Sequence, residues 1–177
     1  MEKLYLERPV FICGHRKTGT TLLINLFDNA KDAVVYPDDS GFFYLYYPRF
    51  DSDKFTRQEK IDRLAEVIIK ESLTDVIGRP VCESAQREAL LDRCNQFYDL
   101  VKNYAKQDFT TKEILQHFME SFRQSFYEKA AEPKVWMEKT TSTEIYALEM
   151  AELFPQAKFI HLLRDPRDNW ASLASGW

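Results

Sequence analysis

The stretch Pro9-Val10-Phe11-Ile12-Cys13-Gly14-His15-Arg16-Lys17-Thr18-Gly19-Thr20-Thr21-Leu22-Leu23 decides the fold of this 177-residue chain. It begins with a short apolar run, which is typical of a buried strand in a parallel sheet. Gly14 and Gly19 then enclose four residues, and an apolar helical pattern follows. The stretch therefore predicts a strand, a tight loop and a helix, the arrangement in which backbone N–H groups bind phosphate. An ordinary glycine-containing turn is the plainer alternative, because short glycine motifs are weak signals by themselves.

The loop differs from that of nucleoside triphosphatases. Their pattern, G-x-x-x-x-G-K-[ST], places a lysine directly after the second glycine. Thr20 takes that position here, and the cations Arg16 and Lys17 lie inside the loop. A kinase or another ATP-dependent transferase would also need Mg²⁺ and an acidic strand end. That class of enzyme is therefore the weaker alternative, and we expect no metal.

The amino-acid composition restricts the binding partners and the cellular compartment that we expect for this chain. The chain is 45% apolar, enough for a sizeable core, and its 24 basic and 28 acidic residues give a net charge of -4. This balance argues against a general nucleic-acid binder and predicts a local basic pocket on an acidic background. Cys13, Cys82 and Cys94 are odd in number and lack zinc-type spacing, which favours a reducing compartment, the cytoplasm. We expect neither a signal peptide nor a membrane-spanning helix.

Strands and helices are expected to alternate along the rest of the chain. The spacing of apolar residues, together with the positions of Gly and Pro, predicts strands at 34–36, 134–140 and 157–163. The same signals predict helices at 56–73, at 84–104, from Thr110 onward, at 142–154 and after Asp165. In the helix at 142–154 we expect Ile145, Leu148, Glu149 and Leu153 to form a mostly apolar stripe that faces inward. The aromatic run at 42–48 fits either core packing or a wall of an acceptor pocket. The alternation predicts one three-layer α/β domain over 1–177, with a mainly parallel central sheet and a helical insertion at about 54–131.

A second motif follows the last expected strand. Arg164 stands at the strand's carboxyl end, where ligands bind in parallel α/β sheets. Asp165 and Pro166 predict the N-cap and first position of a helix, with Ser172 about two turns into it. An arginine fork and a serine hydroxyl are suitable donors for a phosphate. Alternatively, Arg164 forms a local ion pair with Asp165, and Ser172 faces solvent.

Together these elements resemble the sulfotransferases that use 3′-phosphoadenosine 5′-phosphosulfate (PAPS). The run from Arg16 to Leu22 resembles the family's loop pattern [PR]-[KR]-[ST]-G-T-T-[LW]. The run from Arg164 to Ser172 resembles its 3′-phosphate element, Arg-[DN]-Pro-x-[DE] with a serine eight positions after the arginine. The run Glu138-Lys139-Thr140 resembles its central Lys-[TS] element. The pattern is closer to the tyrosyl-protein and carbohydrate enzymes than to the cytosolic enzymes with a histidine base.

The resemblance implies a sulfotransferase that moves a sulfuryl group from PAPS to a hydroxyl acceptor and releases adenosine 3′,5′-bisphosphate (PAP). It implies that Lys17 and Lys139 lie near the sulfuryl group and that Arg164 and Ser172 hold the 3′-phosphate. The residues expected to bind PAPS are Arg16, Lys17, Thr18, Gly19, Thr20, Thr21, Leu22, Arg164 and Ser172. The acceptor can be a small molecule, a glycan or a peptide, and no nucleic acid or membrane is expected as a partner.

The chain departs from the family pattern in two places. Thr141 stands where many small-molecule sulfotransferases have their histidine base. Tyrosyl-protein enzymes have a glutamate after the second strand, the region of Asp38 and Asp39, so these are the candidate bases. A turn-forming acidic pair is equally consistent with the sequence. The other candidate bases are Glu83, Glu138 and His15.

Family members normally continue past the 3′-phosphate element. The chain is therefore expected to be a fragment or an unusually short member that lacks the usual C-terminal part. A non-catalytic PAP- or PAPS-binding protein of the same fold is the alternative from a different functional class.

Overall fold

The computed structural model describes residues 3–28, 30–69, 84–127, 133–141 and 144–175. The chain forms two compact units, one of residues 1–39 and 131–177 and the other of residues 40–130. The helical insertion expected at about 54–131 belongs almost entirely to the second unit. The run Gly78-Arg79-Pro80, between the helices expected at 56–73 and 84–104, lies outside the described residues.

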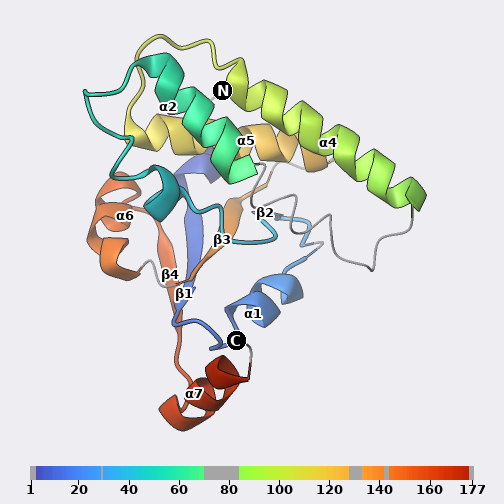
Figure 1. The fold of residues 1–177 in the computed structure, drawn as a ribbon, viewed down its shortest axis with the longest axis vertical. Helices are drawn as coiled ribbons and strands as arrows, with labels where there is room; N and C mark the ends of the chain where they lie inside the picture. Colours follow the sequence, from blue (N-terminus) through green and yellow to red (C-terminus); the bar gives the residue numbers. More distant parts are fainter. Residues whose placement is uncertain (1–2, 29, 70–83, 128–132, 142–143, 176–177) are drawn as a thin grey trace. The chain divides into compact units, whose positions relative to one another are not determined.

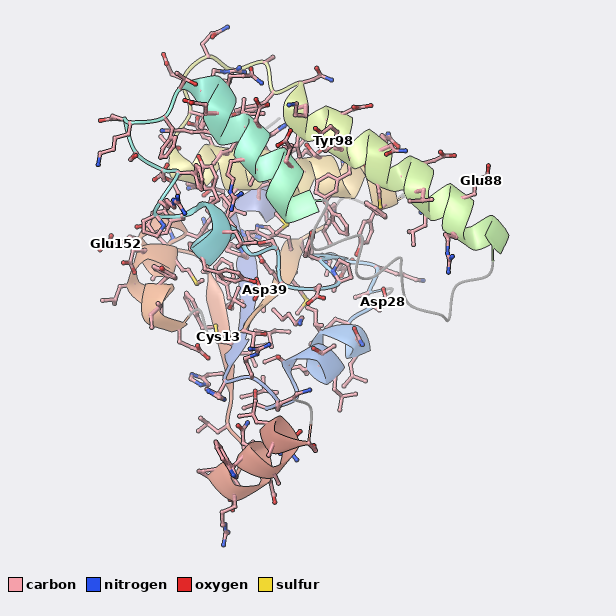
Figure 2. The ribbon with its side chains drawn as sticks, viewed as in Figure 1. Cys13, Asp28, Asp39, Glu88, Tyr98 and Glu152 are labelled. Carbon is pink, nitrogen blue, oxygen red and sulfur yellow. The ribbon has the colours of Figure 1, made fainter. Side chains whose placement is uncertain are left out.

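A four-stranded parallel sheet organises the first unit (Figure 1). The strand order is β2-β3-β1-β4, with β1 Pro9–Gly14, β2 Ala33–Val35, β3 Val135–Thr141 and β4 Lys158–Leu162. Cys13 of β1, labelled in Figure 2, lies opposite Thr140 of β3 and His161 of β4. The first and last expected strands therefore share one sheet, and the α/β prediction is confirmed.

Helix α1, Thr20–Leu26, covers one face of this sheet. Ile24 of α1 packs with Ile12 of β1 and Met137 of β3 in a buried cluster. Because successive strand residues point to opposite faces, the neighbouring residues of β1 and β3 must pack on the other side of the sheet.

Helix α6, Ala147–Leu153, lies on that other side (Figure 1). Phe154 follows α6, and its ring centroid lies 6.3 Å from that of Phe11 and 5.9 Å from that of Trp136. Both Phe154 and Trp136 are fully buried. The first unit therefore has three layers, with α1 and α6 on opposite faces of the sheet.

The inward-facing stripe expected on this helix is wrong for Ile145 and Leu148, whereas Glu149 and Leu153 are half-buried. The described part of this segment starts with a 3-10 turn, η4 Glu144–Tyr146, and α6 begins at Ala147. The side chains of Ile145 and Leu148 are 77% and 78% exposed, whereas Met150 and Phe154 are fully buried. Packing of Phe154 on the sheet fixes the buried face, and Met150, four residues earlier, shares it. Leu148 lies ~200° around the helix from Met150 and so points outward.

Two further segments, near the N-terminus and after β4, complete the described part of the first unit. The 3-10 turn η1, Leu4–Glu7, is held by Trp136, whose indole Nε1–H donates to the Leu6 carbonyl at 3.3 Å. Helix α7, Pro166–Ala174, follows β4 and has Pro166 in its first turn. The Asp165 carboxylate accepts from the Arg167 N–H at 2.9 Å, as expected for an N-cap.

The second unit is helical. Its described elements are η2 Phe42–Tyr46, α2 Arg57–Arg63, η3 Leu64–Ile69, α4 Ser84–Lys102 and α5 Thr111–Phe126. The helix expected at 56–73 is α-helical only to Arg63 and continues with π-type turns to Ile69, where the described segment ends. In the aromatic run, Phe42, Phe43 and Tyr46 are buried, which supports the core-packing interpretation, while Tyr44 is 50% exposed.

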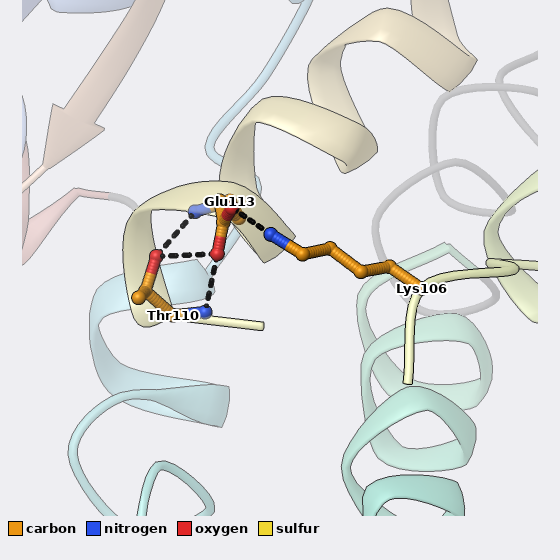
Figure 3. A network of polar contacts seen from close by, with 3 residues as sticks. All are labelled: Lys106, Thr110 and Glu113. Carbon is orange, nitrogen blue, oxygen red and sulfur yellow. Dashed lines mark hydrogen bonds and ion pairs between the residues drawn. The ribbon is translucent and has the colours of Figure 1, made fainter. Parts of the chain in front are cut away.

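A polar network fixes the start of α5 (Figure 3). The Thr110 hydroxyl accepts from the Glu113 N–H at 3.2 Å, and the Glu113 carboxylate accepts from the Thr110 N–H at 2.8 Å. Lys106 forms an ion pair with the same carboxylate. The bond from Lys106, followed by that from the Thr110 backbone, lowers the pKa of Glu113 to about 2. This capping box confirms the helix start expected at Thr110.

Candidate active site

The predicted site residues of the first unit follow the carboxyl ends of its four parallel strands, which is where such sheets bind ligands. In strand order, these residues are Asp38 and Asp39 after β2, Lys139 at the end of β3, the loop 14–19 after β1, and Arg164 after β4. The loop therefore lies between a flank that carries the acids and Lys139 and a flank that carries Arg164.

The loop after β1 has a strained backbone that is held by hydrogen bonds within the loop. Lys17 has a φ of 67°, a left-handed conformation that is uncommon for a residue with a side chain. Gly19, the N-cap of α1, has a φ of 105°. The carbonyl of His15 accepts from the Thr18 hydroxyl at 2.7 Å and from the Thr18 N–H at 3.2 Å. Strain held in place by such bonds is a feature of functional loops.

Gly14 is required where the loop leaves the strand. A Cβ atom at this position would lie 2.7 Å from the Thr18 hydroxyl and 3.0 Å from the Leu162 carbonyl. The second contact is with the backbone of β4, which cannot rotate away as a side chain can. The glycine therefore allows the loop to pack closely against the end of β4.

Two side chains from the second motif hold the carbonyls of the loop. The Arg164 Nη1 donates to the Lys17 carbonyl at 2.9 Å, and the Asn169 Nδ2 donates to the Arg16 carbonyl at 2.9 Å. Asn169 is only 8% exposed. Its role was not predicted, because nothing in the sequence indicates which carbonyl a helical asparagine meets.

We expect Asn169→Ala to lower the free energy of unfolding by about 1–2 kcal/mol, because it leaves the Arg16 carbonyl without this donor. Chemical denaturation followed by tryptophan fluorescence measures the change. The matched control is Asn25→Ala at an exposed position of α1, which should change the stability by less than about 0.5 kcal/mol. An equal effect of the two substitutions would contradict a bracing role for Asn169.

On the other flank, the structure brings predicted catalytic side chains together. The Lys139 ammonium lies 2.5 Å from the Asp38 carboxylate, and these side chains are 12% and 25% exposed. The Asp39 carboxylate, also labelled in Figure 2, accepts from the Thr141 N–H at 3.1 Å. An acid and a cation thus meet beside the loop at the carboxyl edge of the sheet.

The remaining predicted loop residues differ in exposure. Thr20 is buried at the start of α1, Thr21 is exposed and Leu22 is 69% exposed. The side chains of Arg16 and Lys17 are exposed. Ser172 is half-buried on α7, and its carbonyl accepts from the Ser175 hydroxyl at 3.2 Å.

The other candidate bases lie apart from the Asp38–Lys139 pair. Glu138 is 1% exposed, and as the neighbour of Lys139 on a strand it points to the opposite face. His15 is exposed, with its Nδ1 3.2 Å from the Arg16 carbonyl. Glu83 lies outside the described residues.

Cys13 lies directly beneath the loop but is unsuited to be a nucleophile. Its Sγ is 3.2 Å from the Thr140 hydroxyl. Burial raises the pKa of Cys13; the Thr140 contact opposes this shift, and nearby carboxylates, Glu144 first, reinforce it. Because only a thiolate is an effective nucleophile, the raised pKa keeps Cys13 unreactive.

A cleft of about 470 Å³ opens on the Arg164 flank of the loop. It is lined by residues of the loop, β4 and α7, namely His15, Thr18, His161, Leu162, Leu163, Arg164, Pro166, Asn169, Trp170 and Leu173. Its apolar walls with a few polar groups are typical of sites for organic ligands.

Within the part of the chain that the structure describes, no group of three or more His, Cys, Asp or Glu side chains is arranged to hold a metal ion. Among the same residues, no helix combines the length and the apolar character needed to cross a membrane.

The comparison with protein families agrees with this geometry. The family model described as "Sulfotransferase family" matches residues 9–176, almost the whole chain. The chain therefore belongs to the sulfotransferase family. Comparisons with curated proteins and with solved structures gave no match.

Proposed function

We propose that this sulfotransferase uses PAPS as its donor, transfers the sulfuryl group to a hydroxyl acceptor and releases PAP. The observation that carries the proposal is the position of a phosphate-type loop between two strand ends that bear cations. Lys139 lies on one side of this loop and Arg164 on the other. A donor with phosphate at one end and a sulfuryl group at the other fits such an arrangement.

The Arg164 flank suits the nucleotide end of the donor. We assign the 3′-phosphate to Arg164 and Ser172, and the 5′-phosphate to the loop from Arg16 to Leu22. Arg164 already donates one bond to the Lys17 carbonyl. Its guanidinium has further N–H donors that can reach a phosphate while this bond is kept.

The opposite flank suits the transfer step. The acceptor oxygen forms a bond to sulfur, the bond from sulfur to the bridging oxygen breaks, and the electron pair stays on the departing PAP. We assign to Lys17 and Lys139 the stabilisation of the charge that grows on that oxygen. The hydroxyl proton passes to a carboxylate, for which Asp38 and Asp39 are the candidates. The acceptor is a small molecule, a glycan or a peptide.

The loop does not favour an ATP-dependent transferase. Thr20 occupies the position of the expected lysine and is buried at the start of α1. The residue after β4 that faces the loop is Arg164, a cation, where a magnesium site would need an acid.

Calorimetric titration of the chain with PAP, ADP and ATP, with and without Mg²⁺, tests the donor. We expect PAP to bind more tightly than ADP, because only PAP carries a 3′-phosphate, and Mg²⁺ to have no effect. Tighter binding of ATP that requires Mg²⁺ would instead indicate a kinase-type site. Transfer of ³⁵S from labelled PAPS to a panel of phenols, sugars and tyrosine peptides then separates an enzyme from a protein that only binds PAP.

A further inference from the structure

The two neighbouring acids after β2 make different contacts, although the sequence does not distinguish them. The Asp38 carboxylate oxygen Oδ1 meets the Lys139 ammonium at 2.5 Å and accepts from the Asp39 N–H at 2.8 Å. The Asp39 carboxylate oxygen Oδ2 accepts from the backbone N–H of Thr141 at 3.1 Å. Asp38 thus faces a charged side chain, and Asp39 faces the backbone of the neighbouring strand.

The contact of Asp39 joins the two chain segments beyond Val35 and Met137, the end of the register between β2 and β3. Next to this end, the Tyr36 N–H donates to the Met137 carbonyl at 2.8 Å. Pro37 has no N–H and cannot donate a further bond. The Thr141 N–H, farther along β3, instead meets the Asp39 side chain. Asp39 therefore ties the segment after β2 to the tip of β3.

The hydrogen bond between the Asp39 carboxylate and the Thr141 N–H also determines where Asp38 lies. Asp38 is held between Asp39, which is fixed to Thr141, and Lys139, two residues earlier on the same strand. A backbone N–H needs an oxygen acceptor but no negative charge, so an amide oxygen can replace the Asp39 carboxylate. A general base has no such substitute, because it must accept a proton.

We propose that Asp39 is a positioning residue that holds Asp38 against Lys139, and that Asp38 alone is the general base. The inference rests on the proposed function. In the transfer step the acceptor hydroxyl proton goes to the Asp38 carboxylate as the new bond from oxygen to sulfur forms. Asp39 takes no proton and acts through the geometry of Asp38.

Substitutions to Asn and Ala separate the two roles. We expect Asp38→Asn to lower kcat by ~10²-fold or more, because Asn cannot act as a base. Asp39→Asn should lower kcat by about tenfold or less, because its amide oxygen still accepts from Thr141. Asp39→Ala should lower kcat by more than Asp39→Asn does, with little change in PAP affinity.

The matched control is Asp32→Asn. Asp32 joins the same two strands at their other ends, through an exposed ion pair of 2.7 Å with Lys134. We expect this variant to transfer sulfate at the rate of the unsubstituted chain.

Hydrogen exchange of the Thr141 amide, followed by NMR, tests the hydrogen bond between Asp39 and Thr141 without any acceptor substrate. Exchange should speed up in Asp39→Ala and stay slow in Asp39→Asn and Asp38→Asn. Equal exchange in all three variants, or a rate loss in Asp39→Asn as large as that in Asp38→Asn, overturns the proposal. If the unsubstituted chain fails to bind PAP or to transfer sulfate, the proposed function fails, and the exchange result still decides whether Asp39 positions the strand tip.

Discussion

Replacing Lys17 with alanine is expected to lower kcat by ~10²-fold or more, the typical loss when one transition-state donor is removed. Charge on the bridging oxygen appears only as its bond to sulfur breaks, so a cation there acts mainly on the transition state. PAP affinity should therefore fall much less than kcat. Initial rates of ³⁵S transfer, measured with an acceptor that supports turnover, provide kcat, and calorimetry provides the affinity.

The backbone at Lys17 makes this substitution a clean test. Its φ of 67° disfavours alanine as it disfavours lysine, so Lys17→Ala removes the cation without relieving the strain. Lys17→Arg restores the charge and should recover part of the rate. Lys134→Ala, at an exposed lysine outside the site, should leave the rate unchanged. If Lys17→Ala weakens PAPS binding and keeps kcat, Lys17 only binds, and Arg16 or Lys139 becomes the better candidate for the cation at the bridging oxygen.

Replacing Arg164 with alanine is expected to weaken PAP binding by roughly 1.5–3 kcal/mol, the contribution of a charge-assisted hydrogen bond. The substitution also removes the bond from Arg164 to the Lys17 carbonyl, which braces the loop. That second loss affects PAP and ADP alike, because both carry the phosphate that the loop binds. The difference between the two ligands therefore isolates the contact with the 3′-phosphate.

Calorimetric titration of both nucleotides measures this difference. Arg167→Ala is the matched control, because Arg167 lies three residues after Arg164 and its side chain is 89% exposed in an ion pair with Asp165. We expect it to leave both affinities nearly unchanged. An equal loss for PAP and ADP in Arg164→Ala would mean that Arg164 supports the loop and does not contact the 3′-phosphate.

Much of the fold could be predicted because its sequence signals are local. The apolar run before Gly14 predicts β1, and the glycine spacing predicts the loop, since few other residues tolerate a φ such as the 105° of Gly19. Asp165 and Pro166 predict the start of α7 in the same way, and Thr110 with Glu113 predicts that of α5. Each of these sequence signals lies within a few residues of the backbone segment whose conformation it predicts.

The helix before β4 shows where local pattern fails. Ile145 and Leu148 are apolar at helical spacing, yet both are largely exposed. The buried face is decided by Phe154, whose ring packs against Phe11 and Trp136 from two distant strands. Periodicity detects an apolar stripe, and only the sheet determines whether that stripe is covered.

The parallel α/β class, the glycine-containing loop and the residue types at the strand ends follow from the sequence alone, because backbone sterics and apolar periodicity act at short range. Which groups meet depends on the folded arrangement of distant segments. Asp38 and Asp39 are equivalent neighbours in sequence, and they differ because β3 brings Lys139 to one and the Thr141 N–H, 102 residues away, to the other. Likewise, Asn169 reaches the Arg16 carbonyl across 153 residues. Such pairings depend on strand order and register, which arise only when distant segments bury their apolar faces together.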